Sequence, residues 1–153
     1  MKVFVATSYS SQVNYETGEV YPEYREYLER QFSVIESAGG EVFSAVRHDG
    51  YRINDTSPAE AFRVDLDEIK KCDVFIAFLN SKISAGVQTE IGIALTMGKK
   101  ILLARPADVK SEYFNDALIH AGVAEGIALP LDVNELNGKI NEPIHKFSLP
   151  GGK

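Results

Sequence analysis

The sequence predicts an α/β fold, namely a single-domain, Rossmann-like (flavodoxin-like) doubly wound parallel sheet of about five strands. Short apolar runs rich in β-branched and aromatic residues recur along the chain, as in strands that are buried on both faces. Helical patterns alternate with these runs, and such alternation implies right-handed crossovers between parallel strands. A length of 153 residues with 44% hydrophobic content suits one core. We therefore treat residues 1–153 as one domain, with residues 146–153 as a frayed tail.

The expected strands are the apolar runs themselves. They cover residues 2–6 ("KVFVA"), 41–46 ("EVFSAV"), 74–79 ("VFIAFL") and 100–104 ("KILLA"), with a weaker fifth strand at 126–131 ("GIALPL"). Ligands of such sheets bind beyond the carboxyl ends of the strands, where the strand order reverses. The loops that follow the first three strands are long and polar, which favours a functional role, although ordinary solvated loops remain an alternative.

The helices are predicted from periodicity and from their end signals. "YPEYREYLERQFSVIESAGG" ends at paired glycines, and "SPAEAFRVDLDEIKKCD" opens with Ser57 as N-cap, Pro58 at the first helical position and Glu60 completing a capping box. A third helix is expected over residues 85–97. Weaker patterns predict helices around "EYFNDALIHAG" and within "VNELNGKINEPIHKF", the latter interrupted near Pro143.

Composition limits the classes of partner. The formal net charge of −6 argues against binding to a nucleic-acid polymer or to an anionic membrane, because both require clustered Lys and Arg. A small phosphorylated ligand remains compatible with an acidic chain, since backbone amides and hydroxyls can bind it locally. No run is long enough to span a bilayer and no secretory signal precedes the first strand, so we expect a cytoplasmic protein.

Two carboxylates occupy unexpected positions on their helices. Glu90 lies in the middle of the apolar side formed by residues such as Val87 and Ala94, and Asp65 lies within the arc between Phe62 and Ile69. Carboxylates are rarely buried without a partner, because desolvation is costly. Each acid could be ion-paired, for instance to Arg47 or Arg63, or could cap a neighbouring backbone. Two such acids on helices that flank one strand favour a functional site.

The motifs that would indicate other chemistry are absent. There is no HExxH, CxxC or two-His cluster, so no metal is expected, and the single cysteine, Cys72, is interpreted as a packed structural thiol. There is no P-loop and no GxGxxG after the first strand, so no dinucleotide cofactor is expected. Carboxylate chemistry at an anomeric carbon remains, with a Glu as nucleophile or as charge stabiliser and an Asp handling protons. Ser84, Gly86 and the adjoining helix N-terminus could then hold a phosphate.

The segment "DLDEIKKCDVFIAFLNSKISAGVQTEIGIALTMGKKILL" (Asp65 to Leu103) resembles the core signature of the nucleoside 2-deoxyribosyltransferase superfamily. Within that superfamily it is most similar to the nucleoside 5'-monophosphate N-glycosidases, such as the hydrolases of cytidylate and hydroxymethylcytidylate. The resemblance implies that Glu90 is the nucleophile at the ribosyl C1' and that Asp65 is the acid that helps the base depart. Ser84 stands where the transferases carry an aspartate and the monophosphate hydrolases a small phosphate-contacting residue, so the resemblance implies that Ser84 contacts phosphate and that the substrate is a nucleotide.

The resemblance also assigns roles near the first strand. Phe4 stands where enzymes for 2'-deoxy substrates usually carry a tyrosine, which implies a ribonucleotide substrate. Ser8 matches the first phosphate loop of the family, and Ser10 stands where relatives often carry an arginine. Arg47 or Lys82 is expected to replace that positive charge. The loop from residue 48 to residue 56 departs most from the cytidylate hydrolases.

Together, these features predict an N-glycosidase that splits a nucleoside 5'-monophosphate, expected to be a pyrimidine ribonucleotide such as CMP, into free base and ribose 5-phosphate. The family also implies a homodimer. Two enzymatic alternatives are a nucleoside 2-deoxyribosyltransferase and a 2'-deoxynucleoside 5'-phosphate N-hydrolase. A third alternative, from another class, is a module that binds a nucleotide without turnover.

Overall fold

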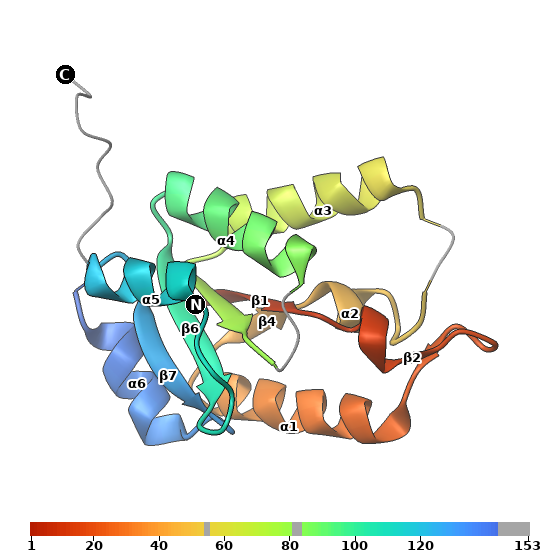
Figure 1. Cartoon of the computed structure of the whole chain (residues 1–153), viewed down its shortest axis with the longest axis horizontal. Helices are drawn as coiled ribbons and strands as arrows, with labels where there is room; N and C mark the ends of the chain where they lie inside the picture. The colour runs from red at the N-terminus through yellow and green to blue at the C-terminus, as the bar shows by residue number, and fades with distance from the viewer. Residues whose placement is uncertain (54–55, 81–83, 144–153) are drawn as a thin grey trace.

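The computed structural model describes residues 1–53, 56–80 and 84–143. Its main sheet contains five parallel strands in the order β4-β1-β5-β6-β7 (Figure 1). The strands are β1 (Lys2–Thr7), β4 (Glu41–Phe43), β5 (Val74–Phe78), β6 (Lys100–Pro106) and β7 (Glu125–Leu129). The predicted doubly wound, flavodoxin-like architecture is confirmed. The predicted frayed tail at 146–153 lies outside the described residues.

Within the described residues, six α-helices connect the strands and cover both faces of the sheet. They are α1 (Pro22–Ser37), α2 (Ala45–His48), α3 (Pro58–Lys71), α4 (Ala85–Thr96), α5 (Tyr113–His120) and α6 (Val133–Asn141). Helices α1 and α6 pack on one face, and α3, α4 and α5 pack on the other (Figure 1). No helix in the described part of the chain has the length and apolar character that crossing a bilayer requires.

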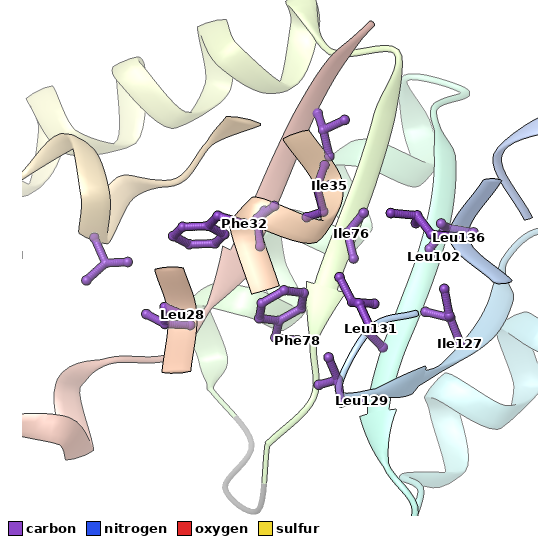
Figure 2. Packing of buried hydrophobic residues seen from close by; sticks show 14 of the residues in the cluster. Leu28, Phe32, Ile35, Ile76, Phe78, Leu102, Ile127, Leu129, Leu131 and Leu136 are labelled. Atoms are coloured by element: carbon purple, nitrogen blue, oxygen red, sulfur yellow. The ribbon is translucent and has the colours of Figure 1, made fainter. Parts of the chain in front are cut away.

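The alternating side chains of the central strands build a separate core on each face. Ile76 and Phe78 of β5 point toward α1, where they meet buried residues such as Phe32 and Ile35 (Figure 2). Phe75 and Ala77 of the same strand point toward α3 and α4. All five residues of β5 are buried, as expected for a strand covered on both faces.

The local end signals of the helices are largely as predicted. The Ser57 side chain accepts a hydrogen bond from the Glu60 N–H at 3.2 Å, with Pro58 at the first helical position of α3. Helix α1 ends at the paired glycines. Gly39 has a positive φ of 82°, and a Cβ on Gly40 would lie 2.7 Å from the Ile35 side chain.

Two predicted elements differ from the structure. The second predicted strand ends at Phe43 instead of residue 46, because residues 45–48 form the helical turn α2. Val46 is buried as expected, but it belongs to this helical turn and not to the strand. A short apolar run is compatible with either conformation. Phe62, expected in the apolar stripe of α3, is 49% exposed, so the buried side of α3 begins further along the helix.

The long loop after β1 contains structure that we did not predict. A 3₁₀ turn, η1 (Ser10–Gln12), leads into a small antiparallel hairpin of β2 (Val13–Asn14) and β3 (Glu19–Val20). Gly18 lies in the turn with a φ of 74°. Val13 and Val20 pair across the hairpin and join the core on the α1 face. The hairpin therefore anchors the loop beside the end of β1.

Candidate active site

A cavity of about 410 Å³ opens above the carboxyl end of β1, bounded by α2, α3 and the start of α4. This position is where chain order reverses in the sheet, since β1 pairs with β4 on one side and with β5 on the other. Of the predicted site residues that the structure describes, all except Arg47 line the cavity, namely Phe4, Ser8, Ser10, Asp65, Ser84, Gly86 and Glu90. Residues from three separate parts of the sequence are thus brought to one place.

Glu90 reaches the cavity from the second turn of α4. Its neighbours on that helix, Val87 and Ile91, are buried in the core between α4 and the sheet. Burial raises the pKa of Glu90 to about 8, and the nearby charge of Asp65 contributes in the same direction. Among the described residues no donor hydrogen-bonds to this carboxylate.

Asp65 enters the cavity from the middle of α3. Burial raises the pKa of Asp65 to about 6; the charge of Asp49 also raises it, and His48 lowers it. The described residues form no ion pair with Asp65, so it shares with Glu90 the absence of a protein partner. The structural alternative, in which Arg47 or Arg63 neutralises these acids, is not what the structure shows.

Arg47 lies away from the cavity, against α1. Its Nε and Nη2 atoms donate to the two carboxylate oxygens of Glu29 at 3.1 and 2.7 Å, and its Nη1 donates to Glu36 at 2.6 Å. Its guanidinium also lies over the Phe32 ring. These bonds use the fork of the guanidinium, so the structure does not bring Arg47 to the position expected of it. Lys82, the other expected cation, lies outside the described residues.

The start of α4 forms the end of the cavity beyond Glu90. Ser84 is the N-cap, and its hydroxyl oxygen accepts from the Val87 N–H at 3.4 Å, which leaves the hydroxyl hydrogen free to donate. Gly86 lies in the first helical turn, where backbone N–H groups lack helical acceptors. Ser8 lies opposite, in the loop after β1. These groups together can hold an anion.

A hydrogen-bond network that we did not predict fixes the loop carrying Ser8. The Tyr24 hydroxyl of α1 donates to the Ser8 carbonyl at 2.8 Å and contacts the Thr7 hydroxyl at 3.0 Å. Asn80, just after β5, donates to the same Tyr24 oxygen at 3.0 Å. Tyr24 thus ties together the ends of β1 and β5. In the sequence it is one of several tyrosines in an amphipathic helix, and nothing in the pattern distinguishes it.

Phe4 combines a core position with a cavity position. Its ring is 1% exposed and lies between Phe43 and Phe75, at 5.4 Å from each ring centroid. It also lines the cavity floor near Glu90. The two interpretations of this residue, as packing and as shaping the sugar site, are therefore compatible.

The loop after the second strand was expected to be functional, but Arg47 was the one side chain predicted there; other side chains of β4 and α2 line the cavity wall instead. Ser44, His48 and Asp49 line the cavity there, and Tyr9 lines it from the loop after β1. Tyr9 donates a long hydrogen bond of 3.5 Å to Asp49. No described group of three His, Cys, Asp or Glu residues has an arrangement that could hold a metal ion.

Comparison with known families identifies one family model that matches most of the chain. The model of the nucleoside 2-deoxyribosyltransferase family matches residues 17–128. No curated protein is significantly similar to the chain in sequence.

Solved structures share the fold over nearly the whole chain. A CMP N-glycosidase of Clostridium botulinum, BcmB, is 27% identical with a TM-score of 0.62, covering 92% of this chain and 98% of its own. The solution structure of BlsM is also 27% identical, with a TM-score of 0.70 and coverages of 91% and 86%. A 2-deoxyribosyltransferase of Bacillus psychrosaccharolyticus is 17% identical, with a TM-score of 0.64 and coverages of 97% and 100%. At that identity the last match shows a common fold alone.

Proposed function

The chain belongs to the nucleoside 2-deoxyribosyltransferase family, and we propose that it is an N-glycosidase that hydrolyses a nucleoside 5'-monophosphate to free base and ribose 5-phosphate. The expected substrate is a pyrimidine ribonucleotide such as CMP. The observation that carries the proposal is that Glu90 and Asp65 line one cavity as carboxylates without a partner among the described residues. The similarity to a CMP N-glycosidase supports the choice of a nucleotide hydrolase.

In the first step, Glu90 attacks C1' of the ribose and forms a C–O bond as the N-glycosidic C–N bond breaks. Asp65 donates a proton to the departing base, which leaves neutral. Water then attacks C1' of the ribosyl enzyme and gives its proton to Asp65. The ester bond to Glu90 breaks, and ribose 5-phosphate leaves.

The two acids are suited to share one proton near neutral pH. With a pKa of about 6 for Asp65 and about 8 for Glu90, the pair carries one proton between these values. The reactive form has that proton on Asp65 and the charge on Glu90. In the empty cavity the higher pKa of Glu90 favours the opposite arrangement, and the positive charge that develops at C1' in the transition state stabilises the ionised Glu90.

The phosphate is proposed to bind at the start of α4. Ser84 and Ser8 supply hydroxyl groups, and the first-turn N–H groups around Gly86 supply unpaired donors. Gly86 precedes Glu90 by four residues, or about 6 Å along the helix axis. A sugar whose C1' contacts Glu90 would therefore extend its 5'-phosphate toward the helix N-terminus. Ser10 lines the same cavity from the β1 loop.

The direct test is to incubate the protein with ribo- and deoxyribonucleoside monophosphates and their nucleosides, and to quantify free base by chromatography. We expect base release from a ribonucleotide, with the nucleoside at least tenfold slower, because helix-terminus donors favour the phosphate dianion. Equal rates for cytidine and CMP would reject the monophosphate assignment. If no compound releases a base, the remaining alternative is a module that binds a nucleotide without turnover.

The transferase alternative follows from the family itself and is tested separately. A second free base is added to the reaction, and the products are examined for a new nucleoside or nucleotide. The hydrolase proposal expects ribose 5-phosphate and free base in equal amounts whether or not the second base is present. Appearance of an exchanged nucleoside would favour the transferase.

We also propose that the protein is a homodimer. Large apolar side chains are exposed on the helices of one face, including Phe62 on α3 at 49% and Tyr113 and Phe114 on α5 at 88% and 66%. Such side chains are enriched at protein interfaces. Sedimentation equilibrium would give twice the chain mass of 16.9 kDa if the proposal holds, and a single chain mass would contradict it.

A further inference from the structure

The cavity has a second polar end that the proposed reaction does not use. It lies on β4 and α2, on the far side of β1 from the start of α4. Neighbouring strands are about 4.8 Å apart, so β4 and β5 lie about 10 Å apart on either side of β1. That span suits a nucleotide whose phosphate lies at the start of α4 and whose base lies over β4.

Ser44 provides the first observation at this end. The residue is only 2% exposed, lines the cavity, and has a hydroxyl group with no hydrogen-bond partner among the described residues. It occupies the N-cap position of α2, yet its side chain makes no capping bond. A buried hydroxyl without a partner is costly, which indicates that a ligand completes it.

Asp49 provides the second observation. It follows α2 and lines the same wall, and the Tyr9 hydroxyl donates to its Oδ2 at 3.5 Å. Asp49 lines the same cavity as Asp65, the proposed acid for the departing base, and its charge contributes to the raised pKa of Asp65. A carboxylate only accepts hydrogen bonds, whereas a serine hydroxyl can also donate. Asp49 and Ser44 therefore offer an acceptor and a donor close to the place where the base must leave.

We propose that Asp49 and Ser44 recognise the base by its 4-aminopyrimidine edge, in which an exocyclic amino group adjoins a ring nitrogen. Asp49 accepts from the amino group, and the Ser44 hydroxyl donates to the ring nitrogen. Cytosine and adenine both present this edge, whereas uracil and hypoxanthine present a carbonyl oxygen and a ring N–H in its place. With the sugar held at Glu90, that oxygen would face the Asp49 carboxylate. This inference rests on the proposed function for the position of the sugar.

The test compares CMP with UMP and AMP with IMP, because the members of each pair differ only at this edge of the base. The wild type is expected to release base from at least one amino compound about ten- to a hundredfold faster, in kcat/KM, than from its carbonyl counterpart. Asp49→Asn should bring this ratio at least tenfold closer to one, and Ser44→Ala should reduce it by a smaller factor. Asp67→Asn removes an exposed acid of α3 outside the cavity and should leave the ratio unchanged.

The ratio separates base recognition from a general effect on the proposed acid. Removing the charge of Asp49 also changes the pKa of Asp65, but this change affects the rates for the amino and the carbonyl nucleotide of a pair alike. Equal rates for amino and carbonyl compounds in the wild type, or an unchanged ratio in Asp49→Asn, would overturn the proposal.

Calorimetric binding to the Glu90→Gln protein distinguishes failure of this inference from failure of the proposed reaction. Tighter binding of CMP than of UMP, or of AMP than of IMP, by at least tenfold would support the base site even if the wild type released no base. Equal binding within each pair, or no binding of any of the four nucleotides, would contradict the base site. If the double variant Glu90→Gln/Asp49→Asn binds the amino and the carbonyl nucleotide equally, the preference for the amino group is assigned to Asp49.

Discussion

Glu90 and Glu29 are both helical glutamates on partly buried surfaces, and their surroundings are opposite. Glu29 on α1 receives two bonds from Arg47 and one from the Tyr51 hydroxyl. Burial alone would raise the pKa of Glu29, yet these hydrogen bonds hold it below its usual value. Glu90 on α4 receives no such hydrogen bond from the part of the chain that the structure describes, and burial raises its pKa to about 8.

This difference separates a structural carboxylate from one that is available for chemistry. Glu29 joins α1 to α2 through its ion pair with Arg47, and its hydrogen bonds engage both carboxylate oxygens. Glu90 is held by the packing of its helix alone, which makes its ionised form unfavourable in the empty protein. Protein stability is thus expected to depend on Glu29, and activity on Glu90.

The largest expected effect is the loss of activity in Glu90→Gln. Removing the nucleophile should lower kcat for base release by more than about a thousandfold. The matched change Glu29→Gln should leave kcat within a few fold and lower the free energy of unfolding by about 1 to 2 kcal/mol, because it weakens a partly exposed ion pair. Base release by chromatography and urea unfolding of both variants check this. A Glu90→Gln protein that retains activity would contradict the assignment.

Glu90→Gln should also stabilise the fold in a pH-dependent way. The pKa of Glu90 lies above its ordinary value of 4.5, so the folded state holds a proton more tightly than the unfolded chain does. Wild-type stability therefore falls as pH rises from 4.5 through about 8. The variant avoids this loss, and its advantage in unfolding free energy should grow to a few kcal/mol by pH 8. If the difference in unfolding free energy between Glu90→Gln and the wild type is the same at pH 5 and pH 8, the pKa of Glu90 is not raised.

Asp65→Asn is expected to have the next largest effect on activity. Loss of proton donation to the base should lower kcat by about a hundred- to a thousandfold while changing nucleotide binding little. Steady-state kinetics and calorimetric binding on the same protein separate these two outcomes. If the variant keeps its turnover and mainly loses thermal stability, Asp65 is a structural residue like Glu29.

Phe4→Tyr tests the floor of the same cavity. A tyrosine hydroxyl would enter the space beside Glu90 that a ribose 2'-OH needs and could donate to the Glu90 carboxylate. We expect the ratio of kcat/KM for CMP over dCMP to fall about ten- to a hundredfold. An unchanged ratio would mean that Phe4 acts only as a core residue, packed between Phe43 and Phe75, and does not select the sugar.

The pH dependence of kcat/KM should be bell-shaped. Below the pKa of about 6 both acids are protonated and Glu90 cannot attack, and above about 8 both are ionised and Asp65 cannot donate. The rate should fall about tenfold for each pH unit outside this window. A profile that stays flat from pH 5 to pH 9 would contradict the shared proton.

The sequence was sufficient to predict the architecture and the acid pair, for identifiable reasons. Fully apolar runs mark strands buried on both faces, and the Ser57–Pro58 start marks α3 by local chemistry. Glu90 and Asp65 were detectable because each interrupts an apolar helix side. The prediction made β4 too long, because an apolar residue such as Val46 can be buried in a helical turn as well as in a strand.

Residues whose roles depend on long-range contacts were not predictable. Arg47 was expected at the phosphate, and only the three-dimensional structure shows it bonded to Glu29 and Glu36 on another helix. Tyr24 and Ser44 are ordinary residues in their local patterns. The Tyr24 hydroxyl reaches the ends of β1 and β5, and Ser44 meets residues of β1 in the cavity, because the fold brings together segments that are distant in the chain.

The central claim is that Glu90 and Asp65 have no ion-pair partner among the described residues and share one proton near neutral pH. Carboxyl ¹³C NMR of protein labelled at Glu and Asp measures it directly, with Glu90→Gln, Asp65→Asn and Glu29→Gln used to assign the signals. We predict titration of Glu90 near pH 8, of Asp65 near pH 6, and of Glu29 below its ordinary value of 4.5. A Glu90 that titrates at or below 4.5, as Glu29 is expected to do, would contradict the claim.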